Sequence, residues 1–173
     1  VLFGADLTAF VREGNTRGLF ERRTVVSLLT GEPEYLLPLG DETPDGWIVT
    51  GYPPEQVDTH GHQAFVSAYK AKFNDMPRLG SVLGYVVPFM IRDMLNKAKS
   101  TETAAMIAAF KDLTTQTICG PVTMRGIDQQ STLGAWVGET TLKGKLPTMK
   151  NFRYVDGKDV MFPEAEVRAA RKM

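Results

Sequence analysis

The hydrophobic positions at the start of the chain alternate between the spacing of buried strands and that of an amphipathic helix. Thr24–Leu29 is continuously apolar enough to predict a strand covered on both faces, and Val1–Phe3 is similar to the second half of another. Between them, apolar residues recur at helical spacing, with Asp6 placed as an N-cap and Gly18 as a left-handed end. Strand, helix and strand predict a right-handed βαβ unit.

A second change of pattern comes at Gly51–Pro54, where two prolines fix φ and remove backbone donors. Before this connector, Glu34–Leu39 predicts a short helix closed by Gly40, and Trp47–Thr50 predicts an extended strand. Three helical patterns follow it. We therefore expect the chain to leave one packed layer for another at this connector.

The three helical patterns differ in how their apolar residues are distributed. His62–Phe73 carries them on one face, whereas Ser81–Ala98 is apolar almost all round in its first half, which predicts burial between layers. Pro88 should kink this second helix or mark a late start. A third helix, with Ser100 as its N-cap, should extend as far as Leu113.

From Thr117 the pattern becomes strand-like, which completes an α/β class with a parallel sheet flanked by helices and a terminal hairpin. Asp156-Gly157 predicts the hairpin turn, returning through Lys158–Met161, and Glu164–Lys172 predicts a short charged helix. The other predicted strands are Thr117–Cys119, Val122–Arg125, Ala135–Thr141 and Asn151–Val155.

Composition excludes several classes of protein. The 173 residues include 20 basic and 20 acidic side chains, so no net field attracts nucleic acid or an anionic membrane. No apolar run approaches the roughly 18 to 20 residues of a membrane helix. The chain begins without an initiator Met or a charged and apolar leader, so we expect a fragment of a longer chain.

The candidates for enzyme or metal chemistry are few. His60 and His62, with Asp58 nearby, lack further metal ligands, and a polar helix start explains them equally well. Cys119 lies in an apolar strand pattern, which indicates a buried thiol rather than a nucleophile. The sequence contains no nucleophile elbow, phosphate loop or dinucleotide fingerprint. We expect no enzyme activity, no cofactor and no metal.

Two loops at the carboxyl ends of predicted strands are better candidates for a binding site. In open parallel sheets, ligands bind beyond these strand ends. Residues 4–6 and 29–31 both contain a glycine that lets backbone donors approach a ligand, while Asp6 and Thr30 add polar side chains. The alternative stays open that Asp6 only caps a helix and Gly31 only turns the chain.

Several short motifs, in this order and spacing, resemble the carboxyl half of the periplasmic solute-binding proteins of ABC transporters, in the branched-chain (leucine/isoleucine/valine) amino-acid binding family. The motifs are Gly4-Ala5-Asp6-Leu7 with Gly18-Leu19, Gly46–Pro53, Phe65-Val66-x-Ala68-Tyr69-x-Ala71-Lys72-Phe73, Gly84-Tyr85, Lys97–Glu102, Gly120–Arg125 with Ile127-Asp128, and Gln130–Thr132.

The resemblance implies a partial type I periplasmic-binding fold, in which two α/β lobes are joined by crossing strands and clamp the ligand. Residues 1–50 would end lobe two, residues 51–113 would form a hinge strand and helices returning to lobe one, and residues 114–173 would supply closing strands, the hairpin and a tail. The implied ligand-binding residues are Phe3, Gly4, Ala5, Asp6, Leu29, Thr30, Gly31, Ser81 and Tyr85, and the implied hinge residues are Gly51, Tyr52 and Pro53.

The function that this resemblance implies is the extracytoplasmic solute-binding component of an ABC importer. Its ligand would be a small amino acid or a related carboxylate or amide, and its partner a membrane permease. The protein would be periplasmic or extracellular, and lipid-anchored or soluble. Two alternatives stay open: a ligand-sensing receptor or regulator of the same fold, and an unrecognised α/β enzyme. We also expect the fragment to self-associate through Val82, Tyr85, Phe89 and their apolar neighbours.

Overall fold

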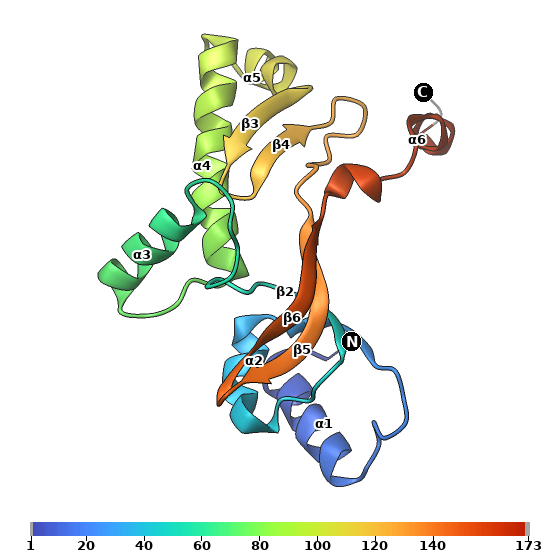
Figure 1. Cartoon of the computed structure of the whole chain (residues 1–173). Coiled ribbons are helices and arrows are strands. Elements are labelled where there is room, and N and C mark those ends of the chain that lie inside the picture. Colours follow the sequence, from blue (N-terminus) through green and yellow to red (C-terminus); the bar gives the residue numbers. More distant parts are fainter. Residues whose placement is uncertain (1, 172–173) are drawn as a thin grey trace. The chain divides into compact units, whose positions relative to one another are not determined.

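The computed structural model describes residues 2–171, which form two compact units (Figure 1). Unit 1 contains the residues up to Gln56 together with Ala135–Val155. Unit 2 contains Val57–Gly134 together with the residues from Asp156 onward. The chain therefore passes from one unit to the other three times.

Unit 1 is built on a four-stranded sheet with the order β1-β2-β5-β6. β1 and β2 are parallel and connected through α2, whereas β2–β5 and β5–β6 are antiparallel. The predicted α/β class is confirmed, with a sheet that is mixed rather than wholly parallel. The elements of unit 1 are α1 (Gly4–Thr16), β1 (Val26–Gly31), α2 (Pro33–Leu39), η1 (Gly40–Glu42), β2 (Ile48–Gly51), β5 (Ala135–Lys143) and β6 (Leu146–Val155).

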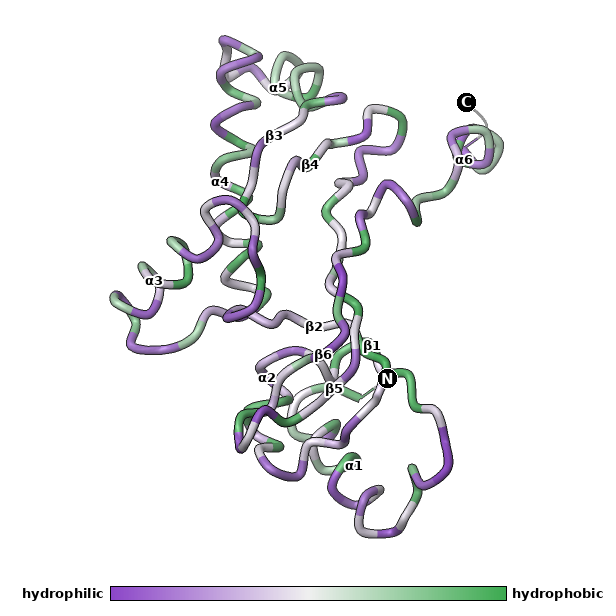
Figure 2. The backbone as a smooth tube through the Cα atoms, viewed as in Figure 1, coloured by the Kyte–Doolittle hydropathy of each residue, from purple (hydrophilic) through white to green (hydrophobic). Residues whose placement is uncertain are grey.

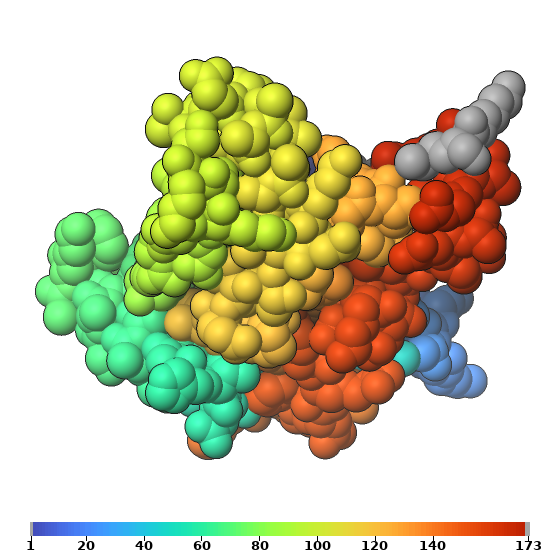
Figure 3. All heavy atoms as spheres, turned by 90° about the horizontal axis from the view of Figure 1, so that it is seen from above, coloured from blue at the N-terminus to red at the C-terminus, as the bar shows by residue number. Residues whose placement is uncertain are grey.

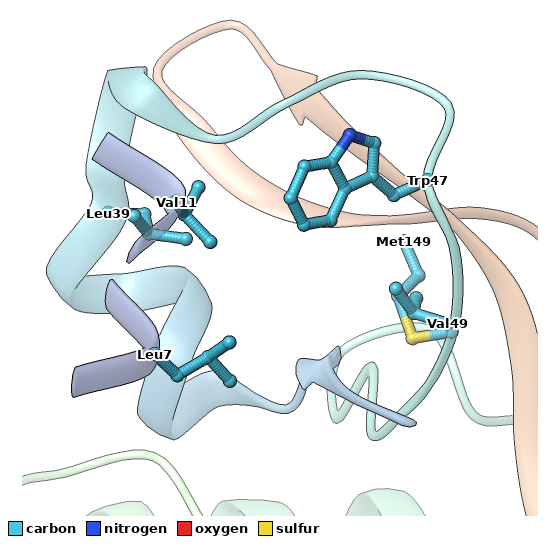
Figure 4. Packing of buried hydrophobic residues seen from close by; sticks show 6 residues of the cluster. All are labelled: Leu7, Val11, Leu39, Trp47, Val49 and Met149. Atoms are coloured by element: carbon cyan, nitrogen blue, oxygen red, sulfur yellow. The ribbon is translucent and has the colours of Figure 1, made fainter. Parts of the chain in front are cut away.

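The core of unit 1 lies between the two helices and one face of the sheet. The side chains in Figure 4 come from α1, from α2, from the strands and from the residue before β2: Leu7, Val11, Leu39, Val49, Met149 and Trp47. Phe20 packs edge-on against Trp47 with ring centroids 4.5 Å apart. Each such side chain stabilises the fold by about 1.5–3 kcal/mol on burial. On the face predicted for the first helix, Leu7 and Val11 thus pack in this core, whereas Phe10 is 44% exposed.

Three expectations for the start of the chain are wrong. Leu2 and Phe3 are exposed and form no strand, and Val1 lies outside the described residues. Phe3, not Asp6, is the N-cap of α1, because the helix begins at Gly4 and places Asp6 in its first turn. The predicted βαβ unit therefore lacks its first strand within residues 2–171. The parallel β1–β2 pair is the one that this stretch forms.

The second predicted strand is present but is not covered on both faces. Val26 and Leu28 on its outer face are 67% and 72% exposed. β1 is the edge strand of its sheet, and the two helices of unit 1 pack against the opposite face. The apolar run was therefore a correct signal for a strand and a wrong one for two-sided burial.

Within the described residues, unit 2 combines the four α-helices α3 to α6 with a two-stranded antiparallel sheet. α4 packs against both α5 and β3, and Met94, Ala109 and Leu113 form the centre of this packing. α5 is hydrophobic along its length (Figure 2). The elements of unit 2 are α3 (His62–Phe73), α4 (Leu79–Ala98), α5 (Thr103–Phe110), β3 (Leu113–Thr117), β4 (Gly120–Met124), η2 (Gly157–Asp159) and α6 (Glu164–Arg171).

α4 differs from its prediction in burial. The helix continues through Pro88, and one stripe is buried while the adjacent apolar stripe is exposed. The buried stripe is Val82, Val86, Met90 and Met94, and the exposed stripe is Leu83, Val87, Ile91 and Leu95. The first half of the helix is therefore not buried between layers.

The third helix also begins and ends differently from its prediction. Glu102 is the N-cap, while the Ser100 Oγ accepts a hydrogen bond of 3.0 Å from the Glu102 N–H. α5 ends at Phe110, and Leu113 already begins β3.

The hairpin predicted at Asp156-Gly157 is wrong. The Asp156 carboxylate accepts a hydrogen bond from the Lys158 N–H at 2.9 Å, and this local bond turns the chain into η2 instead of a returning strand. The hairpin of unit 1 lies earlier, between β5 and β6, where Gly144 has a φ of +66°.

The predicted C-terminal helix is confirmed as α6, although its described part ends at Arg171. In Figure 3 this helix, drawn red, lies beside the orange loop that follows β4. Arg171 donates to the carbonyls of Ile127 and Asp128, and Arg125 donates to the carbonyl of Phe162 at 2.8 Å. The tail is therefore attached to unit 2 by arginine side chains.

Candidate functional site

The predicted strand-end loop and the predicted hinge lie together at one end of the strands of the unit 1 sheet. Gly31 of β1 pairs with Gly51 of β2, Gly51 pairs with Trp136 of β5, and Trp136 pairs with Tyr154 of β6. At this row β1 and β2 end, β5 begins, and β6 ends one residue later at Val155. All three passages of the chain between the units therefore leave or enter the sheet at the strand ends where the candidate site lies.

Gly31 and Gly51 are required by the close approach of β1 and β2. A Cβ atom on Gly31 would lie 2.5 Å from the carbonyl oxygen of Thr50, and one on Gly51 would overlap the carbonyl of Gly31. Both glycines thus have a structural reason that is independent of any ligand. The predicted contact of Gly31 with a ligand stays a prediction.

The N-terminus of α1 lies against α2. Gly4 has a φ of +54°, and its N–H donates to the Tyr35 hydroxyl at 3.4 Å. Asp6 lies in the first helical turn, where the helix dipole favours a carboxylate. The Thr8 hydroxyl donates to the carbonyl of Ala5 at 2.9 Å. Tyr35 therefore links the predicted ligand loop at residues 4–6 to the helix that follows residues 29–31.

An open apolar pocket brings two of the predicted ligand residues together. Phe3 and Leu29 both line this space of about 370 Å³, with Leu2, Leu7, Phe10, Ser27 and Leu28. Thr30 is fully buried, and its Oγ1 lies 2.6 Å from the Oγ of Ser27. The Thr30 hydroxyl is therefore already hydrogen-bonded inside the protein.

Sequence reasoning missed Glu32, the acid that follows the predicted loop directly. It is only 7% exposed, and its Oε2 is buried with no hydrogen-bond partner within residues 2–171. Burial, reinforced by repulsion from Glu34, raises the pKa of Glu32 to about 7. An acid immediately after a strand-ending glycine was the available signal, but its burial depends on tertiary packing.

The predicted hinge residues pack against the sheet that they leave. Tyr52 is buried, its ring lies 5.4 Å from that of Trp136, and Trp136 lies 5.2 Å from Tyr154. Beyond Pro53, the Gln56 side chain donates to the Thr148 hydroxyl of β6 at 2.7 Å. The connector is therefore held to unit 1 as far as the first passage to unit 2.

The remaining predicted ligand residues, Ser81 and Tyr85, lie on α4 of unit 2. The Ser81 Oγ accepts a hydrogen bond of 3.2 Å from the N–H of Arg78 and so helps to begin the helix. Tyr85 is 40% exposed, and its ring packs 4.8 Å from Phe65 and 5.0 Å from Phe89. Of the two, Tyr85 lines an open pocket of about 250 Å³ in unit 2.

The residues considered for metal binding and for nucleophilic chemistry, His62 and Cys119, are buried. Residues 2–171 contain no group of three His, Cys, Asp or Glu side chains that could hold a metal ion. His62 is buried at the start of α3, and burial lowers its pKa. Cys119 is buried too, and burial raises the pKa of its thiol to about 11. No helix in the described part of the chain is long and apolar enough to cross a membrane.

A comparison with protein families decides the class of this fold. A family model described as periplasmic binding protein matches residues 1–145. The chain belongs to this family. The resemblance in the sequence is thereby confirmed, and membership of this family agrees with the expectation that the chain is not an enzyme.

Solved structures of similar fold point the same way. The chain is 18% identical to the leucine-, isoleucine-, valine-, threonine- and alanine-binding protein of Brucella ovis, with a TM-score of 0.76 over 93% of this chain and 43% of that one. The chain is 21% identical to an amino acid ABC transporter substrate-binding protein from Pseudomonas fluorescens Pf-5, with a TM-score of 0.73 over 95% of this chain and 44% of that one. It is 19% identical to an R. palustris solute-binding protein in complex with 4-hydroxybenzoate, with a TM-score of 0.72 over 90% of this chain and 44% of that one.

These similarities establish the fold and not the ligand, because the identities are low. The chain spans less than half the length of the solved structures that it matches. No curated protein matches the sequence.

Proposed function

We propose that this chain acts within the extracytoplasmic solute-binding component of an ABC importer and binds a small amino acid or a related carboxylate or amide. Membership of the periplasmic binding protein family supports the general role. The observation that carries the proposal is the row of strand ends from Gly31 to Tyr154, where the predicted ligand loop and the predicted hinge meet at one edge of the sheet.

In this proposal, unit 1 supplies the lobe-two side of the ligand site. Residues 3–6 and 29–31 approach the ligand with backbone donors and with the Asp6 carboxyl group. Glu32 joins them, because a buried carboxyl with an oxygen that lacks a partner is suited to receive a hydrogen bond from a ligand N–H. Ser81 and Tyr85 are proposed as lobe-one contacts.

Binding is proposed to act through a hinge at Gly51, Tyr52 and Pro53. A ligand that touches both lobes has a higher affinity for the closed state, so it shifts the open–closed equilibrium toward closure. The membrane permease then recognises the closed form. Since the three passages between the units leave one edge of the sheet, few backbone torsions need to change there.

The family implies a location outside the cytoplasm. A periplasmic or extracellular protein, either lipid-anchored or soluble, follows from the proposed role, as does the permease partner.

Self-association is the last part of the proposal, although the surface differs from the one expected. Val82 is fully buried and cannot contribute to it. The exposed stripe of α4, Leu83, Val87, Ile91 and Leu95, is between 37% and 48% exposed and is apolar over four turns. A second copy of this chain would cover such a stripe. A monomer in sedimentation equilibrium at high concentration would argue against this part.

The proposed ligand site is tested with variants of the full-length protein. Isothermal titration calorimetry with L-leucine should give at least a tenfold weaker affinity, about 1.4 kcal/mol, for Asp6→Ala and Thr30→Ala. The exposed Asp41→Ala variant should bind like the wild type.

The buried Thr30 also needs a structural control. Ser27→Ala removes the hydroxyl that pairs with Thr30 and leaves Thr30 itself in place. An equal loss in Ser27→Ala and Thr30→Ala would assign the effect to the local hydrogen bond. Affinities of Asp6→Ala and Thr30→Ala equal to that of the wild type would show that the proposed site is wrong.

A further inference from the structure

The second and third passages of the chain between the units are bonded to each other on both sides of the division. In unit 1, Ala135 of β5 pairs with Val155 of β6. In unit 2, the Gly157 N–H donates to the carbonyl of Thr132 at 3.0 Å, and a Cβ atom on Gly157 would lie 2.8 Å from this oxygen. The two passages bounded by these four residues therefore form one two-stranded ribbon, which we call the crossing ribbon.

The two strands of the crossing ribbon differ in length by one residue. Between the bonded ends, the second passage contains Leu133 and Gly134, whereas the third contains Asp156. Two residues opposite one is the arrangement of a β-bulge, which interrupts the ladder and bends the strand that carries it. A glycine in such a place has a wider range of φ and ψ than any other residue. Backbone rotation in the crossing ribbon is therefore concentrated at these three residues.

The end of the crossing ribbon in unit 2 is fixed to β4. Thr132 donates its N–H to the carbonyl of Thr123 at 2.9 Å, and its hydroxyl accepts the Thr123 N–H at the same distance. Met124, the next residue of β4, forms an isolated antiparallel bridge with Ser131. Since Thr132 also accepts from Gly157, both strands of the ribbon meet the sheet of unit 2 at this threonine.

Arg125 holds the segment that follows the crossing ribbon. Its guanidinium group forms a two-pronged ion pair with Asp128, with Nε 2.9 Å from Oδ1, and donates a further hydrogen bond of 2.8 Å to the carbonyl of Phe162. The Asp128 side chain is 3% exposed, and its Oδ1 also accepts the Gln130 N–H at 3.2 Å. A planar guanidinium fork with these partners has a fixed orientation. Arg125 thus ties the residues after Gly157 to the loop from which the ribbon starts.

We propose that the crossing ribbon moves as one hinge element, which bends at Gly134 and Asp156 while its two strands stay bonded, and that Arg125 is a positioning residue that keeps these strands together. This inference rests on the proposed solute-binding function and adds a second bending place to the predicted hinge at Gly51–Pro53. Without the Arg125 side chain, the third passage separates from the second more readily. Closure on a ligand then has to order it again, and this cost lowers the affinity.

Amide hydrogen exchange in the full-length protein, followed by NMR, provides the first test. The Gly157 amide should exchange at least about 100-fold more slowly than an unstructured amide, and it should not exchange faster when L-leucine binds. The amide resonances of Gly134 and Asp156 should shift on binding. A Gly157 amide that is unprotected, or that ligand binding exposes, would show that the strands separate and overturns the proposal. Unchanged resonances of Gly134 and Asp156 in the bound protein overturn it too.

Ligand affinity provides the second test. Arg125→Met should bind L-leucine at least about tenfold more weakly in calorimetry, and its Gly157 amide should exchange faster. Arg168→Met removes an exposed arginine of α6 that is paired with Glu164 at 3.6 Å, and this matched control should bind like the wild type. A merely structural role of Arg125 would lower the free energy of unfolding and leave the affinity of the folded protein unchanged. That result overturns the positioning role.

A second variant keeps this test usable if Arg125→Met does not fold. The single substitution leaves the Asp128 carboxylate buried without its partner, which is strongly destabilising. The double variant Arg125→Met with Asp128→Leu removes both charges and should show the same loss of affinity. Affinity equal to that of the wild type in the double variant overturns the proposal.

A second probe, 4-hydroxybenzoate, takes the place of L-leucine in these tests if L-leucine does not bind. Binding of either probe together with exposure of the Gly157 amide overturns the inference and leaves the solute-binding function intact. Failure of amino acids, aromatic acids and amides alike to bind the folded protein overturns both.

Discussion

The wild-type protein should lose stability as the pH rises, because Glu32 ionises, and Glu32→Gln should not show this loss. The pKa of this group is about 7 in the folded state against the ordinary 4.5, so the folded protein binds more protons than the unfolded chain between these values. The free energy of unfolding should then fall as the pH rises through this window and stay level above it. At about 1.4 kcal/mol per pKa unit, the loss amounts to about 3 kcal/mol.

Glutamine has nearly the same shape as glutamate and never ionises, so Glu32→Gln should be about 3 kcal/mol more stable than the wild type at pH 8.5 and similar to it at pH 4.5. Urea unfolding followed by circular dichroism at pH 4.5, 6, 7 and 8.5 measures the difference. Asp41→Asn, an exposed acid in η1, serves as the control and should follow the wild type. Parallel pH profiles for Glu32→Gln and the wild type would refute the assigned burial of a protonated carboxyl group.

Three other substitutions or modifications test separate parts of the fold. Thr140→Val should lower the free energy of unfolding by about 1–3 kcal/mol in urea melts, because the backbone N–H of the buried Trp47 loses the Thr140 hydroxyl as its acceptor. An unchanged urea midpoint would contradict this. Gly51→Ala should destabilise the protein strongly in the same assay, since its Cβ would overlap the Gly31 carbonyl, and a neutral effect would show that the strand ends can separate. Cys119, whose pKa burial raises to about 11, should react with iodoacetamide at pH 8 at least about 100-fold more slowly in the folded protein than in urea, and similar rates would count against its burial.

Elements whose ends are set by local residues were predictable from the sequence. α3 runs from His62 to Phe73 as predicted, because Asn74 adopts a left-handed conformation that ends it. Gly40, with a φ of +55°, is the C-cap residue that closes α2 as predicted. The strand expected at Trp47–Thr50 is β2, displaced by one residue.

Burial was less predictable, because it depends on what covers a face. Val26 and Leu28 on β1, and Leu83 and Val87 on α4, have the hydrophobicity of core residues but are exposed. Local hydrophobicity cannot distinguish a face that is packed from one that is open. The same limit hid Glu32, whose chemistry comes from burial and not from its residue type.

The candidate site was predictable as a position in the fold and not as a set of contacts. The expected strand-end loop and hinge share one row of the sheet, from Gly31 to Tyr154. The hydroxyl of Thr30, however, is paired with Ser27, and Gly31 is required by its neighbouring strand. Such pairings depend on side-chain packing that strand patterns do not encode.

The most direct measurement of the proposed role is the thermal midpoint of the full-length protein against amino acids, aromatic carboxylates, and amides including urea. A ligand that binds only the folded state raises stability by about 2.7 kcal/mol at 100 times its Kd. We predict that one of these chemical classes raises the midpoint in proportion to the logarithm of ligand concentration. A folded protein whose midpoint stays constant across the whole panel would contradict a solute-binding function for these ligands.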